Sequence, residues 1–381
     1  MSTIALILML TLVAGFAAGC GGGNQPSQSG GNQPAQGGNQ PAQGGNQPAD
    51  DGKVYSLSLS QHDPASSNKT KYHVDWANTV NEASGGRLDI TVFSDGVLAG
   101  GTGQLDALRT NVCDIAWVFP VYWPGQFPIS EVVTLPLGIT TVPQATNILW
   151  DLYETSPEMQ AEVAEFIPLQ IHTNPVSIIG TANKPVYKVS DLVGMKMRVA
   201  GGAPTDSVSA WGGTPMQLPP GDIFQAVERG TVDGYVFEFS GIVSFSLQEV
   251  TNYFTEVPVY AGPYYLMMNR GSFEALPADL QDIIMSYSNR ETSLDMAYVF
   301  EGDCRRGKNA AIDIGCTIIT ADEAETDEFL AIAHEKVLSE WINTYSSAFN
   351  AQGFVDQVSE LARKYFITSD QLNAELDRLG L

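Results

Sequence analysis

The chain has 381 residues, which is enough for two domains of ordinary size. Hydrophobic residues make up 44% of it and aromatic residues 9%, so most of the chain can bury a core. The formal net charge of −24 argues against nucleic acid as a partner and against a polybasic contact with a membrane. An acidic surface of this kind mainly keeps a protein in solution.

The first residues read as a targeting segment. Residues 4–18 form an apolar run too short for a comfortable transmembrane helix, and Ala17-Ala18-Gly19-Cys20 follows at its end. This ending resembles a bacterial lipobox, so residues 1–20 are predicted to be a lipoprotein signal peptide with Cys20 as the lipidated residue. The alternative is an ordinary secretory signal with an incidental cysteine.

Residues 21–52 repeat Asn-Gln-Pro with glycine, serine, alanine and glutamine between the repeats. Nothing in this composition can be buried, so the segment is predicted to be a disordered tether. A tether directly after a lipid-bearing cysteine would hold a globular body close to the cell membrane, in the periplasm or on the outer cell surface.

The globular part opens with alternating strand and helix patterns. Strands are predicted at residues 54–60, 88–93 and 113–119, with an amphipathic helix at 68–84 and a short helix around residues 105–108. Strands that alternate with helices in this way favour a sheet that is covered by helices on both faces.

The central stretch, residues 184–239, has the same character. A strand at residues 193–199 ends at two glycines, a helix follows at 222–229, and another strand begins at 232–237. Such a βαβ unit binds ligands at the carboxyl ends of its strands. Arg198 is placed there, where the first of these strands opens into a loop.

The later part of the chain reads as further helices and strands. A strand at residues 171–179 is predicted to cross into a second lobe, and a strand at 263–269 to return to the first. A helix from about Leu276 to about Cys304 would reach roughly 40 Å, enough to lie along both lobes. A strand at 317–319 and a mainly helical region at 322–381 follow.

Three motifs of the central stretch, in this order and spacing, carry a family resemblance. They are Gly-Met-Lys-Met-Arg at residues 194–198, Gly-Gly-Thr-Pro at 212–215 and Gly-Thr-Val-Asp-Gly at 230–234. The stretch resembles the solute-binding proteins of TRAP transporters (tripartite ATP-independent periplasmic transporters), the DctP family. The likeness extends from about residue 54 to about residue 320, and the segment Tyr-Trp-Pro-Gly-Gln-Phe-Pro at 122–128 resembles one branch of the family.

The resemblance implies an α/β fold with two lobes, like that of periplasmic binding proteins. Each lobe is a sheet flanked by helices, and a long helix spans both lobes. The boundaries expected are residues 53–174 plus 262–303 for lobe I and residues 175–261 plus 304–381 for lobe II. The function implied is capture of a small organic acid between the lobes and its delivery to the membrane permease subunits of the transporter.

Arg198 is the residue on which the implied mechanism depends. A guanidinium offers a planar fork of donors that matches a carboxylate and does not lose its charge. In the family, the arginine of the first motif holds the carboxylate of the ligand. The alternative role for Arg198 is a structural ion pair with one of the many acidic residues of the chain.

The remaining ligand-binding candidates follow from their positions relative to the family. They are His62 at the end of the first strand, Trp117 and Phe119 in the third, Tyr122 in the loop after it, and Phe237 and Glu238 after the last motif. One arginine among aromatic side chains suits a monocarboxylate with an apolar or aromatic body. Glu238, if turned inward, could bind an amino or hydroxyl group, and the aromatic residues could instead belong to the core.

Signals for catalysis or metal binding are thin. The chain has no Gly-x-Ser-x-Gly elbow, phosphate-binding glycine loop or His-Glu-x-x-His motif, and its four histidines lack metal-ligand spacing. No cofactor, metal site or enzymatic activity is therefore predicted. Cys304 and Cys316 could form a disulfide, whereas Cys113 is expected to be an inert core thiol. The functional alternatives are a ligand-binding sensor for a receptor and an exported enzyme on the same scaffold.

Overall fold

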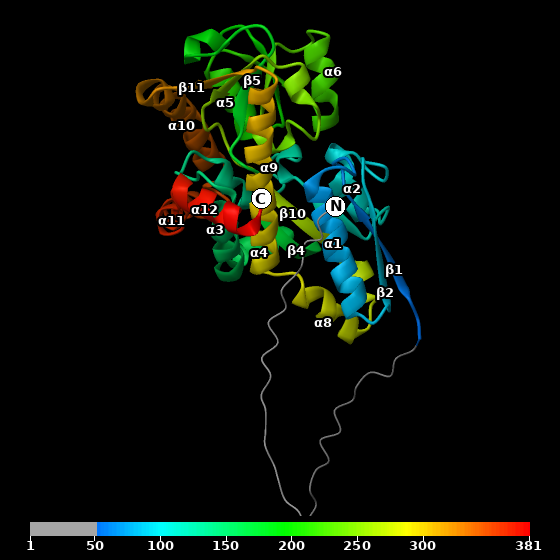
Figure 1. Ribbon diagram of the computed structural model, residues 1–381. Coiled ribbons are helices and arrows are strands. Elements are labelled where there is room, and N and C mark those ends of the chain that lie inside the picture. Colours follow the sequence, from blue (N-terminus) through cyan, green and yellow to red (C-terminus); the bar gives the residue numbers. More distant parts are fainter. Residues whose placement is uncertain (1–51) are drawn as a thin grey trace, which may run out of the picture. The chain divides into compact units, whose positions relative to one another are not determined.

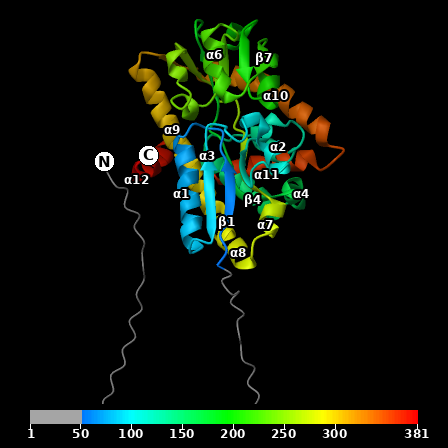
Figure 2. The same cartoon turned by 90° about the vertical axis from the view of Figure 1, so that its right-hand side faces the viewer.

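The computed structural model describes residues 52–381, and the predicted signal peptide, Cys20 and almost all of the predicted tether lie outside this range. The described residues contain two sheets with helices packed on them (Figures 1 and 2). This is the α/β architecture with two sheets that the sequence predicts. None of the helices in this range is both long enough and apolar enough to span a bilayer.

The first sheet has the order β2-β1-β3-β10-β4. Its strands are β1 (Tyr55–Ser60), β2 (Leu88–Phe93), β3 (Ile115–Val118), β4 (Phe166–Thr173) and β10 (Pro263–Asn269). Strand β1 pairs in parallel with β2 and β3, whereas β10 is antiparallel to both β3 and β4. The parallel pairs direct the carboxyl ends of β1 and β3 to the same edge of the sheet.

The second sheet has the order β11-β9-β5-β8-β6-β7. Its strands are β5 (Ile178–Thr181), β6 (Lys196–Val199), β7 (Thr214–Gln217), β8 (Gly234–Phe237), β9 (Tyr253–Glu256) and β11 (Thr317–Thr320). Strand β6 lies parallel to β7 and β8. The carboxyl ends of β6 and β8 therefore also meet at one edge.

Helices cover both sheets. The α-helices are α1 (Asn68–Ala83), α2 (Gln104–Arg109), α3 (Val142–Thr155), α4 (Pro157–Val163), α5 (Ala203–Ala210), α6 (Ile223–Glu228), α7 (Arg270–Glu274), α8 (Ala278–Ser286), α9 (Arg290–Asp313), α10 (Glu323–Tyr345), α11 (Ala351–Lys364) and α12 (Ser369–Leu379). The short 3₁₀ helices are η1 (Gly101–Gly103), η2 (Pro120–Tyr122), η3 (Ser130–Thr134), η4 (Val189–Leu192), η5 (Pro220–Asp222), η6 (Phe239–Gly241) and η7 (Leu247–Glu249). The long helix α9 contacts β4 of the first sheet and β11 of the second, and it runs past both sheets in Figure 1.

The chain passes between the sheets twice at the same place. Residues 174–177 connect β4 to β5, and residues 257–262 connect β9 to β10. The two connections are hydrogen-bonded to each other, because the Ser177 N–H donates to the Tyr260 carbonyl at 2.8 Å and the Asn174 N–H donates to the Gly262 carbonyl at 3.0 Å. The predicted single strand at 171–179 is therefore wrong. Pro175 lies within it, and a proline has no N–H to continue a ladder.

Two other expectations about secondary structure need correction. The helix predicted from Leu276 to Cys304 is two helices, because Asn289 begins α9 with a reciprocal capping box to Thr292. The central βαβ unit also contains α5 and β7 between its expected strand and helix. The sequence reading missed both, since α5 is rich in polar serine and threonine and β7 contains a proline.

The disulfide considered between Cys304 and Cys316 does not form in the structure, where both residues and Cys113 are free. Helix α9 continues nine residues beyond Cys304 to Asp313, which corresponds to about 13 Å of helical rise. The Cys316 thiol instead lies 3.1 Å from the Thr251 carbonyl. Cys113 is buried, and burial raises the pKa of its thiol to about 12, as expected of an inert core residue.

Gly307 marks the place where α9 crosses η6, which follows the second sheet. A Cβ at this position would lie 1.9 Å from the carbonyl oxygen of Phe239, a backbone atom with little freedom to move. We expect Gly307→Ala to lower the free energy of unfolding by about 1–3 kcal/mol, the usual cost of overpacking. At an ordinary helical position, replacing glycine by alanine would instead stabilise the helix by about 1 kcal/mol. Urea unfolding measures the difference.

The matched control is Asn309→Ala, at an exposed position of the same helix. It should change the free energy of unfolding by less than about 0.7 kcal/mol, the span of ordinary helix propensities. Equal stability of Gly307→Ala and the wild type would show that α9 does not approach η6 as closely as described.

Candidate functional site

A pocket lies where the carboxyl ends of β1 and β3 face those of β6 and β8. Its lining comprises Asp63, Lys69, Trp117, Phe119, Tyr122, Asn174, Arg198, Ala200, Pro220, Phe237, Glu238, Gly241, Phe245, Tyr260, Tyr264 and Phe300. Both sheets and α9 therefore contribute to one site. The pocket is nearly closed, with about 10 Å³ available to the centre of a water molecule. That is room for about one water.

Arg198 is a buried cation on β6, with 1% of its surface exposed. Its Nε–H donates to the Leu218 carbonyl at 2.8 Å and its Nη1 donates to the Val236 carbonyl at 3.3 Å. Its Nη2 is buried and has no hydrogen-bond partner. Among the residues that the structure describes, no carboxylate forms an ion pair with Arg198. The structural ion pair considered as its alternative role is thus not present in this part of the chain.

Aromatic side chains form the wall opposite the second sheet. Trp117 and Phe119 of the β3 region stack on Tyr264 of β10, with ring centroids 4.3 Å and 4.4 Å apart. Tyr122 meets Phe119 edge-on at 5.2 Å. Burial raises the pKa of Tyr122 to about 12, and Arg198 is the main influence in the opposite direction. The Tyr122 hydroxyl therefore stays neutral and lies within electrostatic reach of the guanidinium.

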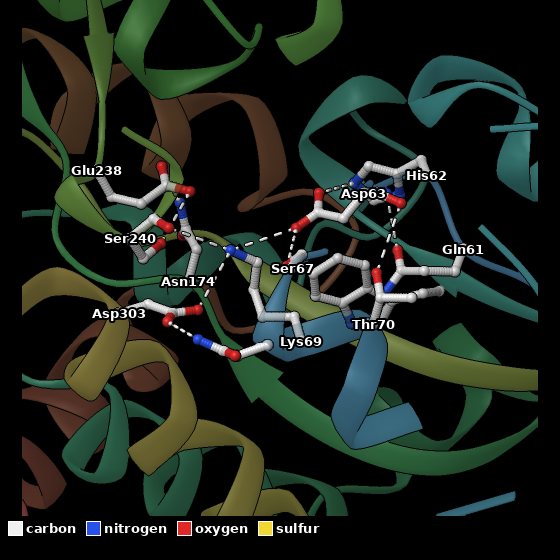
Figure 3. Close-up of polar contacts among 12 residues, drawn as sticks. Gln61, His62, Asp63, Ser67, Lys69, Thr70, Asn174, Glu238, Ser240 and Asp303 are labelled. Atoms are coloured by element: carbon white, nitrogen blue, oxygen red, sulfur yellow. Dashed lines mark hydrogen bonds and ion pairs between the residues drawn. The ribbon is translucent and has the colours of Figure 1, made fainter. Parts of the chain in front are cut away.

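Phe237 and Glu238 end β8 on the other side of the pocket. The Phe237 ring lies 5.3 Å from the Arg198 guanidinium, close enough for a cation–π contact. Gly241 makes room for this ring, because a Cβ there would lie 2.2 Å from it. Burial raises the pKa of the Glu238 carboxyl, while Lys69 and Arg198 lower it. Its hydrogen bonds are long, at 3.3 Å from the Asn174 amide and 3.5 Å from the Ser240 hydroxyl (Figure 3).

Lys69 and Asp63 are pocket residues that the sequence reading missed. Lys69 is 2% exposed, and its Nζ lies 3.3 Å from Asp63 Oδ2, 3.8 Å from Asp303 Oδ2 and 3.3 Å from the Ser240 carbonyl (Figure 3). A signal was available in the sequence. Lys69 precedes His73 and Trp76 by four and seven residues, so it shares the buried face of α1.

Of the seven predicted ligand-binding residues, the structure brings six together in the pocket lining. The exception is His62, which is outside the pocket lining and stacks on Trp117 with ring centroids 4.9 Å apart. Burial lowers the pKa of His62, and both of its ring nitrogens lack hydrogen-bond partners. A neutral, enclosed imidazole of this kind supports the aromatic wall and does not line the space available to a ligand.

His73 and His172 lie near the same tryptophan. The Trp117 indole N–H donates to His172 Nε2 at 3.1 Å, and His172 Nδ1 lies 3.0 Å from the Thr173 carbonyl. This pattern fits a neutral imidazole protonated on Nδ1, and burial lowers the pKa of His172 to about 4. Burial likewise lowers the pKa of His73 to about 3. Within residues 52–381, no group of three or more His, Cys, Asp or Glu side chains is arranged to hold a metal ion.

Comparison with known proteins matches residues 59–343 to the family model DctP, described as "Bacterial extracellular solute-binding protein, family 7". A solute-binding protein of Albidiferax ferrireducens is 25% identical over 219 residues, which cover 56% of this chain and 63% of that protein. A monocarboxylate 2-oxoacid-binding periplasmic protein of Nostoc sp. is 30% identical over 162 residues, which cover 41% of this chain and 43% of that protein. The matched segments thus span less than two thirds of both relatives.

Solved structures give the same family. The crystal structure of a TRAP solute-binding protein from Rhodoferax ferrireducens, in complex with copurified benzoate, superposes with a TM-score of 0.77 at 26% identity. The superposition covers 82% of this chain and 98% of that one, so the two-sheet fold is shared almost throughout. The chain therefore belongs to family 7 of the bacterial extracellular solute-binding proteins, whose members bind solutes and are not enzymes.

Proposed function

We propose that the protein captures a small monocarboxylate with an aromatic or apolar body and delivers it to the membrane permease of a TRAP transporter. The observation that carries the proposal is the buried Nη2 of Arg198, which lines the pocket without a partner. A carboxylate of the ligand would accept from this nitrogen. The two carbonyls that already hold the guanidinium would keep it in place.

The energetics favour an anionic ligand at this position. A buried charge without a counter-charge is costly, and carbonyl oxygens solvate a guanidinium without neutralising it. A ligand carboxylate would supply the missing negative charge through charge-assisted hydrogen bonds, which are stronger than neutral ones. Binding would therefore offset a cost that the ligand-free protein carries.

The other charges in the pocket favour one carboxylate over two. Lys69 is already compensated by Asp63 and Asp303, so Arg198 is the cation left for a ligand among the residues that line the pocket. Asp63 and Glu238 are acidic, and a second ligand carboxylate would face them at short range. Like charges in a low-dielectric site repel strongly.

The walls favour an apolar body. Trp117, Phe119, Tyr264 and Phe237 present ring faces and edges to the space beside Arg198, where an aromatic or aliphatic acid would pack. The benzoate bound to the Rhodoferax protein and the monocarboxylate named for the Nostoc protein support the same chemical class. A sugar acid would leave its hydroxyl groups against these rings without hydrogen bonds.

Entry of such a ligand requires the sheets to separate, since the pocket has room for only about one water. We propose that the connections at 174–177 and 257–262 act as the hinge, a motion common in two-lobed binding proteins. Lobe I (53–174 plus 262–303) would then close on lobe II (175–261 plus 304–381). Lipidation at Cys20 and a tether at 21–52 would keep the carrier close to the permease.

The first test is Arg198→Ala. We expect this variant to lose about 2–5 kcal/mol of benzoate binding, the range found when one partner of a buried charge pair is truncated. Isothermal titration calorimetry with benzoate measures the change. Arg229→Ala, at an exposed site in the same βαβ region, is the control and should bind as the wild type does. Equal affinity of Arg198→Ala and the wild type would contradict the role given to this arginine.

A second test uses pH. Burial raises the pKa of Glu238, and its ionised form places a negative charge near the site of the ligand carboxylate. We expect benzoate affinity to rise as the pH falls from about 8, because the raised pKa means that Glu238 takes up a proton before a simple carboxylate does. Glu238→Gln should bind more tightly at about pH 8 and show a flatter profile.

The control for this test is Glu228→Gln, an exposed acid in the same region. It should keep the pH profile of the wild type. A wild-type affinity that falls steadily as the pH decreases from about 8 would refute the repulsive role of Glu238.

A further inference from the structure

Lys69 joins three separate elements around the pocket. Its Nζ lies 3.3 Å from Oδ2 of Asp63, which follows β1 of the first sheet, and 3.3 Å from the carbonyl of Ser240, which follows β8 of the second. It also lies 3.8 Å from Oδ2 of Asp303 on α9. Helix α9 itself packs against elements of both sheets. One ammonium group thus contacts both sides of the pocket (Figure 3).

We propose that Lys69 is a latch that holds the two sheets in the closed arrangement, a positioning residue that does not itself bind the ligand. Its contact with Ser240 joins the α1 side of the pocket to the β8 side. Separation of the sheets would break this contact, and closure would form it again. The inference accompanies the proposed function but depends on the geometry of the closed pocket alone.

The contacts of Lys69 argue against a direct role in ligand binding. The Ser240 carbonyl and Asp63 Oδ2 each lie 3.3 Å from Nζ, and Asp303 Oδ2 lies 3.8 Å away as a second ion pair, so the protein itself compensates the charge of Lys69. Burial alone would lower the pKa of Lys69, but Asp63, Asp303 and Glu238 raise it above its ordinary value, so the group remains charged. Arg198 differs, since no carboxylate among the described residues pairs with it and its Nη2 has no hydrogen-bond partner.

The partners of Lys69 are themselves held in place. Asp63 accepts from the Ser67 hydroxyl at 3.1 Å, and Asp303 accepts from the Asn68 amide at 2.7 Å and pairs with Arg306. The two carboxylates are therefore anchored to α1 and α9 without Lys69. The Ser240 carbonyl lies in η6, which follows β8 and packs beside Gly307 of α9. Lys69 thus extends from α1 to an acceptor that follows β8.

Removal of the latch should shift the population of the closed form. A two-state equilibrium responds to any contact made in only one of its states. The contact of Lys69 with Ser240 is made in the closed state, so its loss favours the open state. We expect ligand-free Lys69→Met to lose most of the closed population.

Three variants besides Lys69→Met distinguish loss of the latch from loss of folding. Lys69→Met leaves Asp63 buried beside Asp303 without its cation, so Asp63→Asn with Lys69→Met restores the charge balance. Lys69→Arg keeps the charge and should retain closure. Lys71→Met removes an exposed lysine two residues along α1 and is the matched control. Thermal melts of all variants identify those that fold.

The closing experiment measures a distance without ligand. Spin labels on non-canonical residues at Asn78 of α1 and Glu228 of α6 report the separation of the two sheets by pulsed electron paramagnetic resonance, in full-length protein. The wild type and Lys71→Met should show a short-distance population that is depleted in Lys69→Met and in the double variant.

The outcomes divide clearly. Equal distance distributions in the wild type and the folded double variant would overturn the proposal. So would a loss of affinity that differs strongly between benzoate and an aliphatic acid such as butyrate, because that pattern indicates direct ligand contact. If the wild type binds neither acid while the distances still shift, the proposed function fails and the latch stands.

Discussion

The buried guanidinium of Arg198 is the constraint on which the site depends. Strand β6 carries it into the interior, and two backbone carbonyls fix its orientation without supplying negative charge. A side chain held in this way does not need to reorganise when an anion binds. Little of the free energy of binding is therefore lost in ordering it. The donor left unpartnered in the pocket then determines which ligand charge the site can accept.

The site is composite, and neither sheet could form it alone. The first sheet supplies the aromatic wall and, through α1, the compensated lysine. The second sheet supplies Arg198, Phe237 and Glu238. Parallel strand pairs direct the carboxyl ends of β1 and β3, and of β6 and β8, toward the same space. Apolar walls around a few fixed polar groups are the usual composition of a small-molecule site. The two cations of this pocket, Arg198 and Lys69, differ in role because they have different neighbours.

The closed pocket links structure to motion. Its small free volume means that the arrangement described excludes a ligand larger than a water until the sheets separate. The two paired connections between the sheets restrict how they can move, because Asn174 with Gly262 and Ser177 with Tyr260 must move together. Helix α9 adds a third link, since it contacts strands of both sheets. Binding, closure and release would then be parts of one conformational equilibrium. Contacts on both sides of the pocket would shift this equilibrium.

The sequence by itself determined the α/β class, most strands and helices of the first sheet, and the position of Arg198 on a strand beside the site, because hydrophobic periodicity and turn residues are local signals. The family resemblance also pointed to six of the residues that line the pocket. Only the tertiary structure decided that Arg198 lacks an acidic partner among the described residues, that His62 is outside the pocket lining, and that Cys304 and Cys316 remain apart. It alone placed Lys69 against Asp63, Asp303 and Ser240. These features depend on which residues that are distant in sequence meet across the two sheets. No local sequence pattern determines those contacts.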